Sequence, residues 1–275
     1  MTITASAAAS VAKIASIAAS QFASAAPAAN PSADAWFNGF ATLVGALVGA
    51  LAASWIAYRL QLRAVKKKER ETALVEAHQI MFCLVQQINT VLLTWKDHYG
   101  PNVDSRGRFL NVPATTPFDL NRHVIDVAKM TILLDCRKGR AVLYDLNIAQ
   151  EGYRETLLIM NERSLVHKSE LQTAMERSDL GNHREVSDRA VAEAVGGRLM
   201  LSMIGLTDAS YMMLHKTFAK LSTVKDSARQ YVVERFGTDD FTKVDFSETY
   251  GIEKEPTLHY AEAAKLIYGA IAERS

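Results

Sequence analysis

Cysteine is scarce in this sequence: Cys83 and Cys136 are the only two in 275 residues, and their spacing is neither that of a metal site nor that of a redox motif. A disulfide framework is therefore excluded, and the composition suits a reducing compartment. Glycine-rich loops that hold phosphates are also missing, since neither GxGxxG nor GxxxxGK occurs. The net charge is only +1. The overall composition thus points to no cofactor and to no strongly charged partner.

Recognisable catalytic and metal-binding patterns are missing too. The seven histidines are scattered, and the Glu-x-x-His pairs that a di-iron helical bundle needs do not occur. His259 and Glu262 have the reverse order. Cys136 precedes several basic residues, but a helix predicted over 118–138 places it near an electronegative helix C-terminus, which disfavours a reactive thiolate. We therefore expect no enzyme activity, no metal and no cofactor.

Acidic and basic side chains are absent from one long stretch, residues 36–58. A helix of this length spans about 35 Å, more than the roughly 30 Å of a bilayer's hydrocarbon core. Aromatic residues that favour the membrane interface stand near both ends, namely Trp36, Phe37, Phe40, Trp55 and Tyr58. A buried core helix and a cleaved signal peptide are the alternatives. The run is long for the first, and its positive charges follow rather than precede it, unlike the second. We predict a transmembrane helix.

A dense basic segment follows the apolar run directly. Residues 59–70 have a net charge of +5, with Glu69 opposed by Arg59, Arg63, Lys66, Lys67, Lys68 and Arg70. Basic residues that flank a span stay on the cytoplasmic side, so we expect an inner-membrane protein with its N-terminus outside and its C-terminal domain in the cytoplasm. The same side chains can bind anionic lipid headgroups. Residues 71–275 carry a net charge of −4, which disfavours nucleic-acid binding.

One side of the predicted transmembrane helix is nearly flat. Gly45, Gly49 and Ala53 recur every four residues, and bulky residues gather on the opposite side. Small residues at this spacing let two membrane helices approach closely, which favours association. We therefore expect a homo-oligomer that forms through this face.

The first segment, residues 1–35, is rich in alanine and serine and nearly uncharged. Its apolar residues recur at helical spacing, at Val11, Ile14, Ala18 and Phe22. Two interpretations stay open for this outside tail: an amphipathic helix on the outer membrane interface, or a disordered segment.

Helical periodicity dominates residues 71–275. Apolar residues alternate three and four apart from Leu74 to Trp95, in a stripe wide enough for a helix of a bundle. Further helices are expected over 118–138, ended by Gly139, over 140–166, over 184–235 with a joint at Gly196 and Gly197, and from Pro256 to Ile271. The alternation at 241–246 is too short to make a sheet. The predicted fold is all-α, a single transmembrane helix that continues into a cytoplasmic helical bundle.

Two long connections stand out in this bundle. Residues 99–117 contain three prolines, and residues 237–256 are acidic and aromatic. Long loops in compact domains tend to be functional or disordered, so each is either a site for a protein partner or a disordered loop. The carboxylates of the second loop lack the spacing of an EF-hand calcium site.

The sequence therefore predicts a single-pass, membrane-anchored helical protein for interaction, scaffolding or sensing, with the lipid bilayer and its own copies as partners. The alternative is a membrane-perturbing effector, in which the small-residue face and the N-terminal tail assemble into a pore or lesion. A third hypothesis is a membrane-tethered enzyme whose site has no recognisable motif. Dye leakage distinguishes the effector from the scaffold, and a polar pocket facing the bilayer would favour the enzyme.

Overall fold

The computed structural model describes residues 33–126, 130–134, 136–178, 188–237, 244, 246 and 248–272. The chain divides into two compact units, Met1–Lys67 and Lys68–Ser275. Throughout the described residues the regular structure is helical, with no β-strand, so the all-α prediction is confirmed. The two interpretations of the N-terminal tail concern residues that, up to position 32, lie outside the described part.

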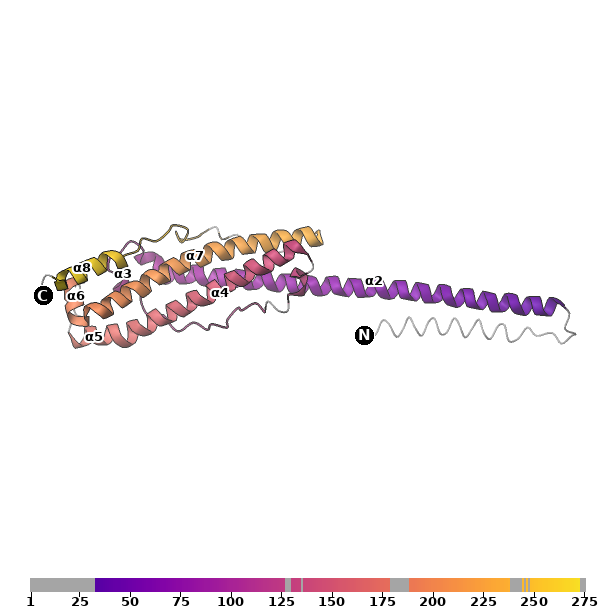
Figure 1. Ribbon diagram of the computed structural model, residues 1–275, viewed down its shortest axis with the longest axis horizontal. Coiled ribbons are helices and arrows are strands. Elements are labelled where there is room, and N and C mark those ends of the chain that lie inside the picture. The colour runs from indigo at the N-terminus through magenta and orange to yellow at the C-terminus, as the bar shows by residue number, and fades with distance from the viewer. Residues whose placement is uncertain are drawn as a thin grey trace. The chain divides into compact units, whose positions relative to one another are not determined.

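The helices differ greatly in length (Figure 1). In chain order they are α2 (Ala33–Thr94), the π-helical turn η1 (Trp95–Tyr99), the 3₁₀ turn η2 (Gly100–Asn102), α3 (Arg108–Asn111), the 3₁₀ turn η4 (Thr131–Leu133), α4 (Arg137–Val166), the π-helical turn η5 (His167–Leu171), α5 (Gln172–Arg177), α6 (Asp188–Val195), α7 (Gly197–Phe236) and α8 (Tyr260–Ala272). The long helices α4 and α7 lie side by side in the second unit.

The apolar stripe predicted on α2 forms one wall of the core of the second unit. Its buried members include Ala77, Ile80, Met81, Leu84, Ile88, Val91, Leu92 and Trp95. They pack in one cluster with buried residues of α4, such as Leu146 and Leu157, and of α7, such as Leu214 and Leu221. Full burial of a leucine or isoleucine contributes about 1.5–3 kcal/mol, so this cluster is the main source of stability.

Three aromatic rings join the ends of these helices. The Trp95 and Tyr211 rings meet edge to face with centroids 5.6 Å apart, and the Tyr99 and Tyr211 rings meet likewise at 5.0 Å. The Tyr211 hydroxyl donates to the backbone oxygen of Tyr99 at 2.7 Å, which satisfies a buried polar group. The aromatic cluster therefore fixes the turn at which α2 ends against the middle of α7.

The helix predicted over 118–138 is wrong. Residues 118–126 form a turn and extended backbone, and His123 has a positive φ of 61°. The side-chain amide of Asn161 accepts from the Phe118 N–H at 2.7 Å and donates to the Phe118 oxygen at 2.9 Å. Gln150 makes the same pair of bonds with Ile125, both at 2.8 Å. These carboxamides replace the partners that a helix would have given the backbone, so extended structure is stable here.

Gly139, predicted as the end of that helix, lies instead in the first turn of α4. A Cβ atom at this position would stand 2.5 Å from the Leu133 carbonyl oxygen and 2.9 Å from the Tyr231 hydroxyl. Glycine is needed here because the preceding loop crosses directly over the helix.

The remaining helices follow the predictions more closely. α4 covers the predicted 140–166, and the joint at Gly196 and Gly197 is confirmed, since α6 ends at Val195 and Gly196 has a φ of 86°. Residues 184–187, the start predicted for this helical region, lie outside the described part. The last helix begins at Tyr260 rather than at Pro256.

The structure describes the two long connections to different extents. Residues 99–117 contain η2 and α3 and place Arg108, Phe109 and Val112 in the interior, so disorder is the wrong interpretation for this loop. Of residues 237–256, positions 238–243, 245 and 247 lie outside the described part, whereas Ile252 is buried in the main core. The short alternation at 241–246, which was not expected to form a sheet, falls almost wholly among the undescribed positions.

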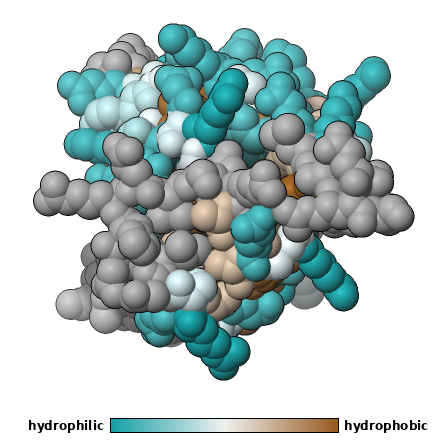
Figure 2. Space-filling view, turned by 90° about the vertical axis from the view of Figure 1, so that its left-hand side faces the viewer, coloured by the Kyte–Doolittle hydropathy of each residue, from teal (hydrophilic) through white to brown (hydrophobic). Residues whose placement is uncertain are grey.

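Figure 2 shows the end of the second unit that carries α5, α6 and α8. Hydrophilic residues cover much of its described surface, and a smaller hydrophobic area lies between them. Beneath this end is a second core cluster, made of Phe109, Leu171, Val191, Met200, Met203 and Ile204. The second unit thus has a main core and a smaller core near α6.

Candidate functional site

The apolar run of α2 is exposed along its length. An 18-residue window of this helical stretch has a mean hydropathy of 1.9, with 0 % of it buried. By length and composition it is the one stretch among the described residues able to cross a membrane. Its large side chains stay accessible, for example Trp36 at 81 %, Leu51 at 64 % and Trp55 at 60 %. A helix of a soluble core buries such residues, so the structure argues against the core-helix alternative.

The small residues predicted to pack in the membrane are equally uncovered. Gly45, Gly49 and Ala53 are all exposed, and a Cβ atom at either glycine would meet no described heavy atom within 4 Å beyond the adjoining backbone of its own helix. Their spacing keeps them within one strip of the helix. In the described part of the chain no group outside the helix lies against either glycine, so a larger side chain could be placed there without a clash with these residues.

The basic segment continues the same helix, and all of residues 59–70 are exposed. The Arg59 guanidinium lies 4.8 Å from the centroid of the Trp55 ring one turn earlier, a cation–π contact at the predicted membrane boundary. Arg70 has a second role, because its Nη2 donates to the backbone oxygen of Phe236 at 3.1 Å. This bond satisfies a carbonyl at the C-terminus of α7, where a cation is favoured.

A buried polar cluster that the sequence analysis missed lies in the second unit. Arg108 is 1 % exposed, and its Nη2 donates to Asp208 Oδ1 at 2.5 Å and to the Thr257 oxygen. The guanidinium carbon lies 4.3 Å from the Tyr211 ring centroid. Asp208 Oδ2 accepts from the N–H groups of His259 and Tyr260 at 2.7 and 2.8 Å. This carboxylate joins α3, α7 and the start of α8, which explains why α8 begins at Tyr260.

Arg163 is a second arginine with no exposed surface. It donates to three carbonyl oxygens of the 99–117 connection and to the Thr207 hydroxyl; the carbonyls belong to Phe109, Val112 and Pro113. Burial lowers the pKa of this guanidinium. It ties the connection to α4 and α7. Its position three residues after Met160, on the apolar face of the predicted helix, is the signal that the sequence offered.

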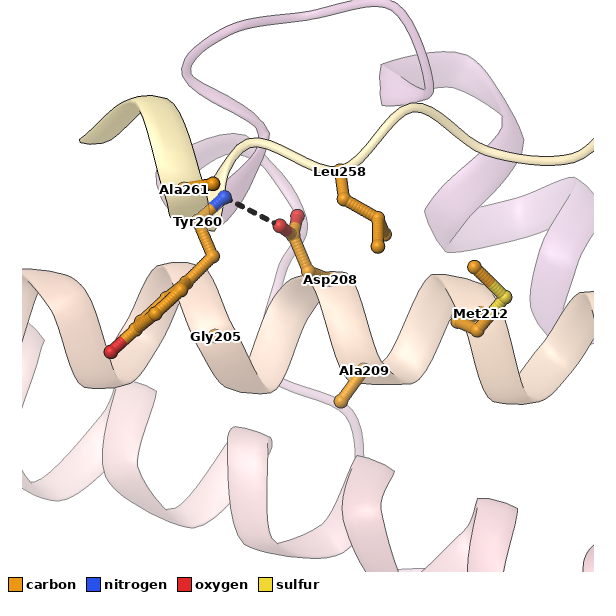
Figure 3. Close-up of a pocket in the computed structure, with 7 residues that line it drawn as sticks. All are labelled: Gly205, Asp208, Ala209, Met212, Leu258, Tyr260 and Ala261. Atoms are coloured by element: carbon orange, nitrogen blue, oxygen red, sulfur yellow. Dashed lines mark hydrogen bonds between the residues drawn. The ribbon is translucent and has the colours of Figure 1, made fainter. Parts of the chain in front are cut away.

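A pocket of about 490 Å³ opens beside Asp208 (Figure 3). Its lining is mostly apolar and consists of Gly205, Asp208, Ala209, Met212, Leu258, Tyr260 and Ala261. Figure 3 shows the Asp208 carboxylate turned toward the Tyr260 N–H, while Leu258 and Met212 lie to one side. Because Asp208 is already engaged by Arg108 and by two backbone N–H groups, the pocket presents no carboxylate for acid–base chemistry.

Several carboxylates of the 237–256 loop lie outside the described residues, so only the remaining candidate chemical groups can be placed. In the described part of the chain no three His, Cys, Asp or Glu residues approach closely enough to hold a metal ion. A helix over 118–138 would have placed His123 and Asp126 one turn apart, but residues 121–123 form a turn and residues 124–126 have no regular structure.

The prediction for Cys136 is wrong in its physical basis. Cys136 is the N-cap of α4 rather than the end of a helix, and its sulfur accepts from the Gly139 N–H at 3.4 Å. This hydrogen bond lowers the pKa of the thiol. Cys83 differs, because burial raises the pKa of its thiol. Cys136, which is exposed, is therefore the more reactive of the two cysteines.

Burial predicts a pH-dependent stability through His167. This ring is 6 % exposed, and its pKa is lowered first by burial and then by the charge of Arg163. Above its ordinary pKa of about 6.5, the ring is neutral in both the folded and the unfolded chain. As the pH falls below that value, the unfolded chain gains the proton first, so the free energy of unfolding decreases. Thermal unfolding recorded between pH 8 and pH 5 should show this loss, and His167→Gln should reduce it; an unchanged slope would contradict the assignment.

Comparison of the chain with protein-family models, with curated proteins and with solved structures gives no match.

Proposed function

We propose that this chain is a single-pass membrane protein whose helical domain serves as an interaction, scaffold or sensing module. Residues 36–58 cross the bilayer, residues 59–70 hold the cytoplasmic side, and residues 71–275 form the cytoplasmic domain. The observation that carries the proposal is the exposed, apolar and uncharged stretch of α2, which is followed at once by a net charge of +5. No catalytic role is part of this proposal.

The free energy of insertion supports this placement. Leucine, isoleucine, phenylalanine and valine each favour the centre of a membrane helix by about 0.3–0.6 kcal/mol, whereas a lysine, arginine or aspartate opposes it by about 2.5–3.5 kcal/mol. The stretch has several of the first kind and none of the second; the exposed ones include Phe40, Leu43, Val44, Leu47, Val48, Leu51 and Ile56. In water the same side chains would form an apolar surface of a kind that soluble monomers rarely expose.

An interaction role for the domain is supported by its surface. Large hydrophobic side chains project from the second unit on both α2 and α4, at Val75, Phe82, Tyr144, Leu158 and Leu165, each more than half exposed. Such side chains are the ones through which helical domains bind other proteins. We infer that the domain receives a protein partner or a further copy of the chain, and that the membrane helix confines this contact to the membrane.

The test of the proposal is membrane retention combined with protease access. The full-length protein with a tag at each end should stay in the membrane fraction after alkaline carbonate washing. The N-terminal tag should be cleaved in intact cells with a permeable outer envelope, and the C-terminal tag only after the cells are opened. A chain that remains in solution without detergent would refute the proposal. Collapse of the membrane potential on expression would favour the pore-forming effector instead.

A matched pair of variants sharpens this test. Val48→Lys with Leu51→Lys places two charges in the proposed span, at a cost of about 2.5–3.5 kcal/mol each, and should release the protein from the membrane. Val75→Lys with Phe82→Lys makes the same change at side chains of similar exposure, 58 and 61 % against 58 and 64 %. This second pair should leave retention unchanged. Equal release by both pairs would show that the effect is not specific to the span.

A further inference from the structure

One end of the second unit brings together three segments that are remote in the sequence. They are the first residues of α2 in this unit, the loop and first turn at 130–140, and the last turn of α7. Lys138 Nζ lies 2.8 Å from Glu234 Oε2, and the Tyr231 hydroxyl donates to the Ile132 oxygen at 2.8 Å. The hydrogen bond from Arg70 to the Phe236 oxygen joins the α2 segment to the last turn of α7. Figure 1 shows the start of α4 and the end of α7 at this same end.

The loop that precedes α4 is held in place on both sides. The Glu76 carboxylate accepts from the Thr131 hydroxyl at 3.0 Å and from the Ile132 N–H at 3.1 Å. Ile132 and Leu133 are buried, at 2 and 0 % exposure. Leu134 follows them with 51 % of its surface exposed. Among the described residues of this loop, 130–134, Leu134 is therefore the large apolar side chain that is exposed.

Exposed cations stand on each of the three segments that meet at this end. We call the set the basic end; its exposed members are Lys68, Arg70, Arg137, Lys138, Arg140 and Arg235, with Glu69, Glu71 and Glu234 as the exposed acids among them. With the Glu76 carboxylate of this loop included, these ten side chains have a net charge of +2, whereas Lys68–Ser275 as a whole carries −3; Asp135 lies outside the described residues. The positive charge is therefore concentrated at this end and is opposed elsewhere in the unit.

We propose that the basic end docks on anionic phospholipid headgroups, with Arg137 and Arg140 at the phosphates and Leu134 in the membrane interface. An apolar side chain among cations is the chemistry by which proteins attach to the surface of an anionic bilayer. The inference rests on the proposed function, because the transmembrane helix supplies the bilayer. Arg70 follows Tyr58 by only 12 positions, so the chain holds Arg70 within about 40 Å of the span in any arrangement of the two units.

Docking would make the orientation of the domain at the membrane depend on the charge of the lipid. On a zwitterionic bilayer the domain is held by its tether alone, and on an anionic bilayer it is held also by the basic end. The surface that faces protein partners would then be oriented by lipid composition. This gives the sensing role of the proposed function a specific ligand, the anionic headgroup.

The experiment uses the full chain in lipid nanodiscs, with a fluorophore on Cys136 in a Cys83→Ala background. Cys136 is exposed, two positions from Leu134, and has the more reactive thiol. Lipids with a quencher on the acyl chain are included equally in nanodiscs of phosphatidylcholine alone and of phosphatidylcholine with phosphatidylglycerol. We expect quenching in the anionic nanodiscs and little in the zwitterionic ones. Equal quenching in the two kinds of nanodisc would overturn the proposal.

Variants assign the effect to the basic end. Arg137→Gln with Arg140→Gln should weaken docking about 30-fold, the loss of two cations at about 1 kcal/mol each near an anionic surface. Leu134→Ala should weaken it further. Lys168→Gln with Arg177→Gln removes two exposed cations from η5 and α5 and should leave the quenching unchanged. Equal loss in both charge variants would also overturn the proposal, because it would show general charge attraction.

Failure of the inference can be told apart from failure of the proposed function. Carbonate extraction of the same labelled protein from vesicles of either lipid measures insertion independently of quenching. Retention without composition-dependent quenching rejects docking by the basic end and leaves the transmembrane helix in place. Release from the vesicles rejects the transmembrane helix itself, and with it the docking that depends on it.

Discussion

Asp208→Ala should lower the free energy of unfolding of the helical domain by about 3–5 kcal/mol, the effect of removing one partner from a buried ion pair. The Arg108 and Asp208 side chains are 2 and 7 % exposed and lie 2.5 Å apart. Without the carboxylate the guanidinium stays buried and uncompensated, and the N–H groups of His259 and Tyr260 lose their acceptor. We also expect α8 to detach more readily, since this acceptor occupies the capping position of that helix.

Thermal unfolding of the full-length protein in detergent, followed by circular dichroism, measures this loss. The matched control is Asp145→Ala. It breaks an ion pair of similar length, 2.7 Å, between Lys220 and Asp145, whose side chains are 36 and 44 % exposed. Pairs at this level of exposure contribute about 0–1 kcal/mol, so the control should unfold nearly as the parent does. If the two variants unfolded alike, the buried pair would not have the structural role assigned to it.

Gly45→Ile with Gly49→Ile should abolish cross-linking of the oligomer in membranes. Lipid provides no hydrophobic drive for helix association, so the contact depends on close approach of two backbones across small residues. Two isoleucines would hold the helices apart. Neither side chain would meet an atom of its own chain within 4 Å at its Cβ, so the effect falls on association rather than on folding.

The control for this variant is Val44→Ile with Val48→Ile. These residues have the same spacing and lie on the bulky side of the helix, where they are 41 and 58 % exposed. Cross-linking should persist in this control. Persistence in the glycine variant as well would show that the chain either remains a monomer in the span or associates through another surface.

The parts of the fold that the sequence predicted correctly are those where one physical requirement dominates. From Leu74 to Trp95 the need to bury an apolar stripe sets the period, and the structure buries that stripe. At Gly196 a positive φ is required between two helices, and glycine is the residue that adopts it without strain. Local sequence is sufficient in both cases.

The helix predicted over 118–138 failed because its apolar residues satisfy a different geometry. Ile125, Ile132 and Leu133, none of which belongs to the apolar stripe that predicted this helix, are buried, and they lie in irregular backbone and a 3₁₀ turn; Val124 and Leu134 of that stripe are 44 and 51 % exposed. The groups that favour this geometry, the carboxamides of Gln150 and Asn161, are 25 and 43 residues away from the atoms they bind. The local pattern of apolar residues does not reveal hydrogen-bond partners that are so distant in the sequence.

The buried arginines were missed for a related reason. Single charged residues within helical patterns are usually exposed, so Arg163 was not separated from the other charges of its helix. Its partners are backbone carbonyls of another segment, which have no sequence signature. The residues of the predicted span are a different case. The structure places them on one exposed helix, and their role in a membrane is tested by the experiments in lipid and by the variants described above.

The side-chain amides of Asn161 and Gln150 fix the two ends of the segment 118–125 and leave its middle less constrained. Phe118 and Ile125 are clamped at their backbones, and Gln87 binds the His123 oxygen at 2.8 Å. Between Phe118 and Ile125, Asp119, Asn121 and Arg122 are exposed, and the Asn121 N–H donates to the Asp119 carboxylate at 2.9 Å within the same turn. Leu120 packs against the main core, so added length after it, between Asn121 and Arg122, would leave these contacts in place, which makes this point of the turn the natural place to insert a reporter domain.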